Sequence, residues 1–143
     1  DLRESNLVTI SIGANDFLHK IDLKSLDVSN IIGLKNKVTE VLPDIEKCIK
    51  EVRKYAKDDI IIVGYYNPIP FLFNTSGNDL DELFAYIDDE YNKIANNNNC
   101  RYLSMYQLFK KNTNFLPNPA DIHPNLDGYQ EMANQIYSFY RGK

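Results

Sequence analysis

The stretch Ile60-Ile61-Ile62-Val63-Gly64 decides the fold of this chain. Its four consecutive β-branched residues predict a β-strand, because branched side chains fit an extended backbone and the glycine ends the run. No polar residue alternates with the apolar ones, so both faces of this strand should be covered. Strands of this kind are typical of parallel sheets that carry helices on both sides.

Two further runs outside this stretch predict two more strands. Leu7–Ile12 is short, apolar and mostly β-branched, and Gly13 stops it. Arg101–Met105 reads as the third strand. Between the first strand and the next helix, Asn15–Gly33 is polar and irregular, which predicts a long loop with room for a short helix.

Helical periodicity occupies the segments between the strands. Pro43 interrupts the first helical pattern, which predicts either a kink or two helices with a new start near Asp44, and Lys57–Asp59 should end it. Asp79 is a candidate cap for the second helix, which the asparagine run 96–99 ends. The apolar positions of the three predicted helices are Leu34, Val38, Val41, Ile45, Ile49 and Val52; Leu80, Leu83, Phe84, Ile87, Tyr91 and Ile94; and Tyr129, Met132, Ala133, Ile136 and Phe139.

The order of strands and helices predicts an α/β fold, a parallel sheet with helices on both faces, in a single domain over residues 1–143. In such sheets functional groups gather at the carboxyl ends of the strands. Asn15, the loop 67–73 and His123 all follow strands or lie in the loop after the last one. The topology therefore allows them to converge.

Composition excludes several classes of function. The formal net charge of −4 argues against a nucleic-acid surface, and no apolar run is long enough to span a bilayer. No phosphate-binding glycine motif and no zinc-type cysteine spacing is present, so the sequence predicts neither a nucleotide nor a metal site. Cys48 and Cys100 are expected to be free thiols, although a disulfide between them remains open.

The late stretch from Pro119 to Tyr129 holds one of the two histidines in the chain, His123. A carboxylate, Asp121, stands two residues before it, and an apolar helical pattern begins shortly after. A histidine held beside a carboxylate on a loop that enters a helix is well placed to act as a general base. The alternative is a surface histidine that merely precedes a helix.

The chain resembles the SGNH (GDSL-type) esterases and lipases. Three elements carry the resemblance: Gly13-Ala14-Asn15-Asp16 after a strand, Asp121-Ile122-His123-Pro124-Asn125 with Gly128-Tyr129 before a final helix, and Gly64-Tyr65-Tyr66-Asn67-Pro68, which is similar to the bacterial lipase/acylhydrolase branch. The resemblance spans the chain from the family's third conserved block to its last. It implies a flavodoxin-like, three-layer α/β/α fold, of which this chain would be the carboxyl-terminal portion.

The resemblance also implies roles for single residues. Asn15 matches the asparagine whose amide stabilises the oxyanion, although a simple turn residue is the alternative, and Gly13 would let the backbone turn sharply there. His123 matches the general base. Asn67 and Phe71 are candidate substrate-binding residues in the loop after the central strand, whose aromatics could instead pack on the core. The resemblance implies no cofactor.

Two departures from the family pattern matter. The family places the acid three residues before the histidine, where this chain has Ala120; Asp121 is the candidate acid, and a backbone carbonyl could orient His123 instead. The family's nucleophile belongs to a GDS element on an earlier strand. None of the seven serines here, at positions 5, 11, 25, 29, 76, 104 and 138, has that context. Ser11 is interpreted as a residue of the first strand.

We therefore expect a serine ester hydrolase whose nucleophile lies upstream; the start at Asp1 rather than Met fits a fragment or a processed chain. The alternative is a non-catalytic α/β fragment or binding module. The substrate would be a small-molecule or lipid ester. Loss of the earlier strand would expose the edge of Leu7–Ile12, so the chain should pair with its missing amino-terminal segment or self-associate. The resemblance favours an extracytoplasmic or membrane-anchored bacterial location.

Overall fold

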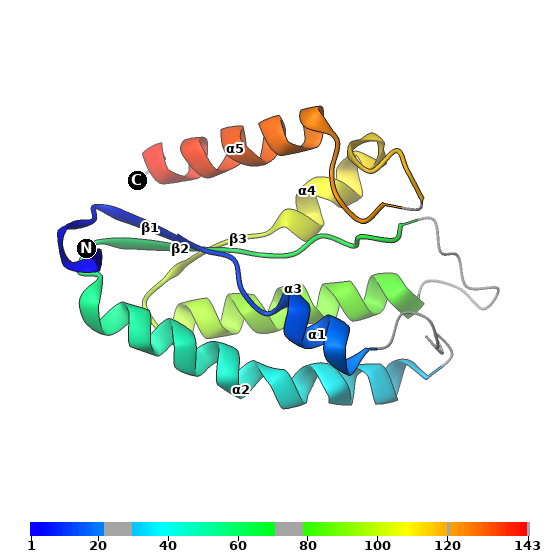
Figure 1. Ribbon diagram of the computed structural model, residues 1–143, viewed down its shortest axis with the longest axis horizontal. Coiled ribbons are helices and arrows are strands. Elements are labelled where there is room, and N and C mark those ends of the chain that lie inside the picture. Colours follow the sequence, from blue (N-terminus) through cyan, green and yellow to red (C-terminus); the bar gives the residue numbers. More distant parts are fainter. Residues whose placement is uncertain (22–29, 71–78, 120, 143) are drawn as a thin grey trace.

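The computed structural model describes residues 1–21, 30–70, 79–119 and 121–142. Within these residues, three parallel strands form one sheet in the order β1-β2-β3. Their bounds are Leu7–Ile10 for β1, Asp59–Val63 for β2 and Arg101–Leu103 for β3. Figure 1 shows helices on both sides of this sheet, so the predicted α/β fold with a covered parallel sheet is confirmed.

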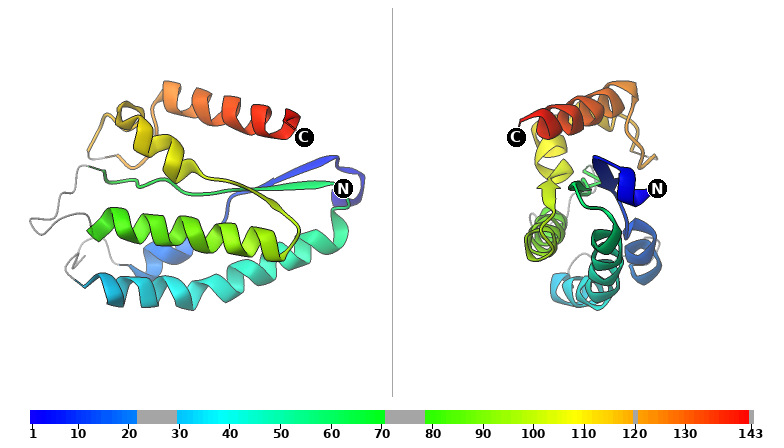
Figure 2. Two further views of the ribbon diagram at one scale, coloured as in Figure 1. Left: turned by 180° about the vertical axis from the view of Figure 1, so that it is seen from behind. Right: turned by 90° about the vertical axis from the view of Figure 1, so that its left-hand side faces the viewer.

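The side chains of β2 alternate between two separate hydrophobic cores. Ile60 and Ile62 pack with residues of α1 (Ala14–Lys20), α2 (Ile31–Tyr55) and α3 (Asp79–Asn97). Ile61 and Val63 pack on the opposite face, with α4 (Met105–Lys111), η3 (Thr113–Phe115) and α5 (Leu126–Arg141). All four side chains are at most 5% exposed. The end-on view in Figure 2 shows the two helical layers with the sheet between them.

The helix α2 continues through Pro43, and the prediction of a second helix starting near Asp44 was wrong. Proline removes one backbone donor and crowds the preceding turn, a cost that usually breaks a helix. Here Pro43 is exposed, while Val41, Leu42 and Ile45 around it are all buried. Packing on both sides of the proline therefore holds the helix together.

The ends of several elements differ from the prediction. Ser11 lies outside β1, which ends at Ile10, so its assignment to the strand was wrong. Ala14–Lys20 forms the short helix for which the predicted loop had room, and residues 22–29 of that loop lie outside the described part. α2 ends at Tyr55, before Lys57, and Asp59 already belongs to β2.

The third strand is also shorter than predicted, because Ser104 begins a helix that the sequence did not indicate. Its hydroxyl accepts a hydrogen bond from the Gln107 N–H at 3.1 Å and caps α4. Met105 therefore lies in α4 and is fully buried there. The 3-10 turn η3 follows α4 and leads into the loop that carries His123.

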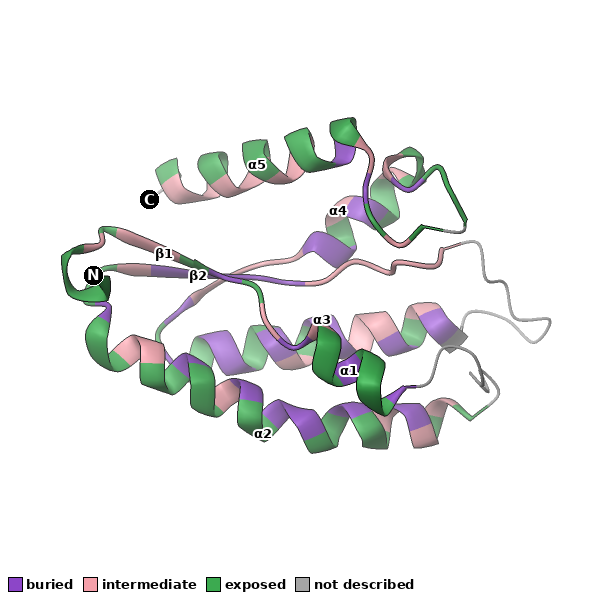
Figure 3. Ribbon diagram, viewed as in Figure 1, coloured by how far each residue is buried: buried purple, intermediate pink, exposed green. Residues whose placement is uncertain are grey.

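The two helical layers differ in how many buried side chains they contain. Figure 3 shows buried residues concentrated where α2 and α3 face the sheet, whereas α5 is mostly half-buried or exposed. In α5, which is described over its full length, Gly128 is the one buried residue. The side chains through which α5 contacts the sheet are only partly covered: Met132, Ile136, Phe139 and Tyr140.

Candidate active site

Gly13 makes the turn that leads from β1 to Asn15. Its φ of 103° lies in the left-handed region that side chains rarely adopt, and it caps the start of α1. A Cβ at this position would lie 2.3 Å from the Tyr91 hydroxyl and 2.6 Å from the Cδ1 of Ile45. Backbone conformation and available space therefore both require glycine here.

Two tyrosine hydroxyls hold this turn in place. Tyr65 accepts a hydrogen bond from the Ala14 N–H at 3.1 Å, and Tyr91 donates one to the Ile12 carbonyl at 2.6 Å. The rings of Phe17, Tyr65 and Tyr91 contact one another edge to face, with centroids 5.8 to 6.5 Å apart. Burial raises the pKa of both tyrosines, which keeps their hydroxyls protonated.

Asp121 contacts His123 twice. Its Oδ1 lies 2.7 Å from Nδ1 of the imidazole and accepts the backbone N–H of His123 at 2.9 Å. Two hydrogen bonds lower the pKa of Asp121 below its ordinary value. The larger effect comes from the backbone N–H of His123 and the smaller one from its ring. A carboxylate two residues before the histidine therefore reaches the ring, and it would favour the tautomer with the proton on Nδ1.

The loop that carries His123 is anchored on both sides of that residue. The Tyr66 hydroxyl donates to the Ile122 carbonyl at 3.0 Å. Asn125 donates its backbone N–H to the Phe115 carbonyl at 2.9 Å, and its side chain accepts the Gly128 N–H at 2.8 Å, capping α5. These bonds fix where the imidazole leaves the backbone, although the imidazole itself is largely exposed.

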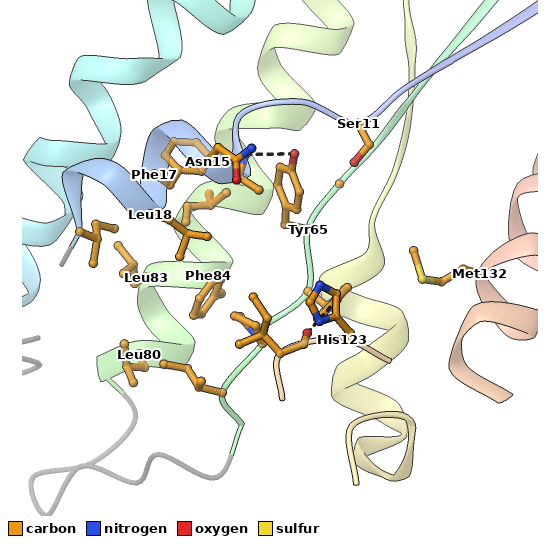
Figure 4. Close-up of a pocket in the computed structure, with 18 residues that line it drawn as sticks. Ser11, Asn15, Phe17, Leu18, Tyr65, Leu80, Leu83, Phe84, His123 and Met132 are labelled. Atoms are coloured by element: carbon orange, nitrogen blue, oxygen red, sulfur yellow. Dashed lines mark hydrogen bonds between the residues drawn. The ribbon is translucent and has the colours of Figure 1, made fainter. Parts of the chain in front are cut away.

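One cavity of about 370 Å³ brings the two regions together. Asn15 and His123 both line it, from α1 and from the loop before α5 (Figure 4). Most of the remaining wall is apolar, and Met132 of α5 closes part of it. The other lining residues are Ser11, Ala14, Phe17, Leu18, Ile21, Gly64, Tyr65, Tyr66, Pro68, Ile69, Leu80, Leu83, Phe84, Ile87 and Ile122.

The other predicted site residues lie at varying distances from this cavity. Gly13 and Asp121 do not line it, but they hold Asn15 and His123. Asn67 does not line the cavity either, although Pro68 and Ile69 form part of its wall. The side chain of Asn67 instead accepts a hydrogen bond from the Ile69 N–H at 3.0 Å. Phe71 lies outside the described residues, so its predicted contact with substrate stays a prediction.

Sequence reasoning missed two tyrosines and a serine at this site. Tyr65 and Tyr66 directly follow the buried strand β2, and this position at the carboxyl end of a parallel strand was the available signal. Ser11 lines the cavity because β1 ends one residue before it. Strand periodicity could not locate that end.

Several kinds of site are absent from the part of the chain that the structure describes. No group of three or more His, Cys, Asp or Glu side chains there could hold a metal ion. No helix in the same residues has the length and apolar character needed to cross a membrane. Cys48 is exposed and Cys100 is buried, and both are free thiols, as predicted.

Comparison with known proteins agrees with the fold. The GDSL-like Lipase/Acylhydrolase family matches residues 1–131, which include the Gly13 turn, Tyr65, Tyr66 and the His123 loop. No curated protein matches the chain. The match covers nearly the whole sequence, and we conclude that the chain belongs to the GDSL-like lipase/acylhydrolase family.

Proposed function

We propose that this chain supplies the oxyanion-binding asparagine and the catalytic histidine–aspartate pair of a serine ester hydrolase. Membership of an acylhydrolase family supports hydrolysis of acyl groups as the general activity. One observation supports the roles proposed for the single residues: Asn15 and His123 line one cavity, and Asp121 contacts the imidazole at 2.7 Å. These are the groups that a serine nucleophile requires beside it.

In the proposed reaction, a serine hydroxyl attacks the ester carbonyl carbon while the Nε2 of His123 takes its proton. Asp121 keeps the other ring nitrogen protonated and stabilises the imidazolium that forms. The amide of Asn15 donates to the developing oxyanion, a contribution worth about 10²–10³-fold in rate in other acyl-transfer enzymes. The intermediate expels the alcohol, which receives the proton from His123. Water repeats the sequence to release the acid.

We propose that the nucleophilic serine lies upstream of residue 1. Among the serines that the structure describes, Ser11 lines the cavity but lacks the GDS context, and Ser104 is bonded to the buried carboxylate of Asp88. Neither has a hydrogen bond to His123 among the described contacts. An upstream segment would bring the serine to the cavity from another strand.

The substrate in this proposal is an ester with an apolar acyl group. Phe17, Leu83 and Phe84 are among the apolar side chains that form the wall, and few polar groups interrupt it. Apolar walls with a small number of fixed polar groups are typical of sites that hold small organic ligands. A small-molecule ester and a single lipid acyl chain both meet this description.

Labelling with a fluorophosphonate, read by intact mass, tests the proposal. In a protein that carries the upstream segment, the label should attach to a serine in that segment, and His123→Ala should abolish labelling. His19→Ala is the matched control, because this exposed histidine of α1 does not line the cavity. This chain alone should take no label.

Two outcomes would contradict the proposal. A label on Ser11 of this chain would place the nucleophile here and not upstream. A longer protein that neither takes the label nor hydrolyses p-nitrophenyl esters would exclude a serine hydrolase and favour a binding module.

A further inference from the structure

Tyr65 and Tyr66 leave the central strand in opposite directions. Consecutive residues of an extended chain point to opposite faces of a sheet. Tyr65 packs against the core of α1, α2 and α3, whereas Tyr66 packs against the other core and stacks on Phe109 with ring centroids 4.3 Å apart. The two tyrosines therefore enter different layers from one point on β2.

The hydroxyl of Tyr65 reaches the turn that presents Asn15. It accepts the N–H of Ala14, the residue directly before Asn15, at 3.1 Å. The contact spans 51 positions in the sequence and ties the turn to the end of β2.

The hydroxyl of Tyr66 makes the equivalent contact on the other side. It donates to the carbonyl of Ile122, the residue directly before His123, at 3.0 Å. Burial raises the pKa of Tyr66 to about 12, so the hydroxyl keeps its proton and remains a donor at any working pH. Each tyrosine thus holds the backbone next to one member of the candidate site.

The strand from which both side chains extend is buried in the centre of the sheet. Ile60, Ile61 and Ile62 of β2 are at most 1% exposed. Beyond the strand, the Gly64 N–H still donates to the Leu103 carbonyl at 2.9 Å. A single peptide bond separates the two tyrosines, so the positions of their hydroxyls are set together by the centre of the sheet.

We propose that Tyr65 and Tyr66 are positioning residues that together set the separation between the Asn15 amide and the His123 imidazole. Tyr65 acts through Asn15, and Tyr66 acts through His123. This inference rests on the proposed function, because the separation matters only if both groups serve one reaction. Neither hydroxyl is assigned a direct role in the chemistry.

The kinetic test uses the protein that carries the upstream segment. Tyr65→Phe and Tyr66→Phe should each lower kcat about three- to tenfold, the effect of one neutral hydrogen bond, with little change in KM. Tyr106→Phe is the matched control. It removes the hydroxyl of a buried tyrosine that is hydrogen-bonded to Lys110 and does not line the cavity. The control should leave kcat unchanged.

A crossed pair of double variants separates positioning from general loss of stability. In an Asn15→Ala background, Tyr65→Phe should have no further effect, because the residue through which it acts is gone. Tyr66→Phe should keep its full effect in that background. The proposal would be overturned if Tyr65→Phe lowered kcat equally in the wild-type and Asn15→Ala backgrounds. It would also be overturned if Tyr106→Phe lowered kcat as much as Tyr65→Phe and Tyr66→Phe do.

A second measurement on this chain needs no enzymatic activity. In Tyr65→Phe, exchange of the Ala14 amide hydrogen should accelerate about tenfold, since one hydrogen bond that protects it is lost. In Tyr66→Phe, the heteronuclear NOE of the His123 amide should fall. If the longer protein hydrolyses no ester, the proposed function fails, yet these readouts still decide whether the tyrosines hold the two loops; unchanged values would overturn the inference.

Discussion

The pair of Asp121 and His123 depends on a turn of only two residues. Such a short separation brings carboxylate and ring together because the backbone N–H of His123 binds the same oxygen, Oδ1, that contacts the ring. The bond to the backbone N–H therefore holds the carboxylate in the position where it contacts the imidazole. Asp121 and His123 are both largely exposed, so solvent screens their attraction and the hydrogen-bond geometry matters more than the charge.

Asp121→Asn should therefore lower the kcat of the hydrolase only moderately, by about tenfold, which is below the usual range for loss of an acid–base group. The asparagine oxygen can still accept the backbone N–H, but the neutral amide no longer stabilises an imidazolium. Steady-state kinetics on an ester substrate measures this change. Asp127→Asn, an exposed carboxylate in the first turn of α5, is the control and should change kcat little.

The same contacts predict how the Asp121 carboxylate responds to acid. Its pKa is lowered from 3.8, so the folded state binds this proton less readily than the unfolded state does. The stability that the contact contributes is present above the unfolded pKa and is lost as the pH falls through the folded one. An NMR titration of the Asp121 carboxyl carbon should give a midpoint below 3.8; a midpoint above it would show that the contact is absent in solution.

Gly13→Ala should destabilise the fold by roughly 2–5 kcal/mol, from backbone strain together with overpacking. The new Cβ would meet the Tyr91 hydroxyl and Ile45 in a conformation with positive φ. Urea denaturation measures the loss. Gly142→Ala is the control, since the nearest atom to its Cβ is 3.2 Å away and its φ is −81°. Equal stability of the two variants would contradict the observed turn.

At the level of elements, the sequence predicted what periodicity and strand composition can reveal. The apolar run of β2 and the apolar faces of α2 and α3 were found. On α5 the prediction was right for Met132, Ile136 and Phe139 but wrong for Tyr129 and Ala133, which are exposed. The short helix α4 was missed because seven residues give too little periodicity to detect, and its start depends on one capping hydroxyl, that of Ser104. Asn15 and His123 could be proposed from the order of their motifs. The contacts of Tyr65 and Tyr66 could not, because their partners lie 51 and 56 positions away.

Pro43 gives the clearest test at this scale. Pro43→Ala should stabilise the chain by about 1–3 kcal/mol, because alanine restores a helical hydrogen bond and removes a steric clash inside a long helix. Chemical denaturation of both proteins measures the difference. Lys47→Ala, another exposed position in α2, should change the free energy of unfolding by less than about 0.5 kcal/mol. A loss of stability in Pro43→Ala would show that α2 depends on the proline.

At the level of the whole molecule, β1 is an edge strand among the described residues, where β2 is its one partner. An unpaired strand edge is a template for another strand. We expect this chain, when purified alone, to self-associate through that edge.

Thr9→Lys tests this expectation, since Thr9 is exposed on β1. Two lysines facing each other across paired edges should raise the dissociation constant at least about tenfold. Sedimentation equilibrium measures it. Gln130→Lys on α5 introduces the same charge away from the edge and should leave association unchanged; if both variants dissociate alike, the contact lies elsewhere.

The half-buried face of α5 determines how the protein would fail when heated. The layer that carries His123 is held by fewer buried side chains than the layer of α2 and α3, and weakly packed segments detach first. Ester hydrolysis should then be lost at temperatures where circular dichroism still records most of the helical signal. Such inactivation would reverse on cooling, because the histidine would be lost through undocking of one helix while the rest of the chain stays folded.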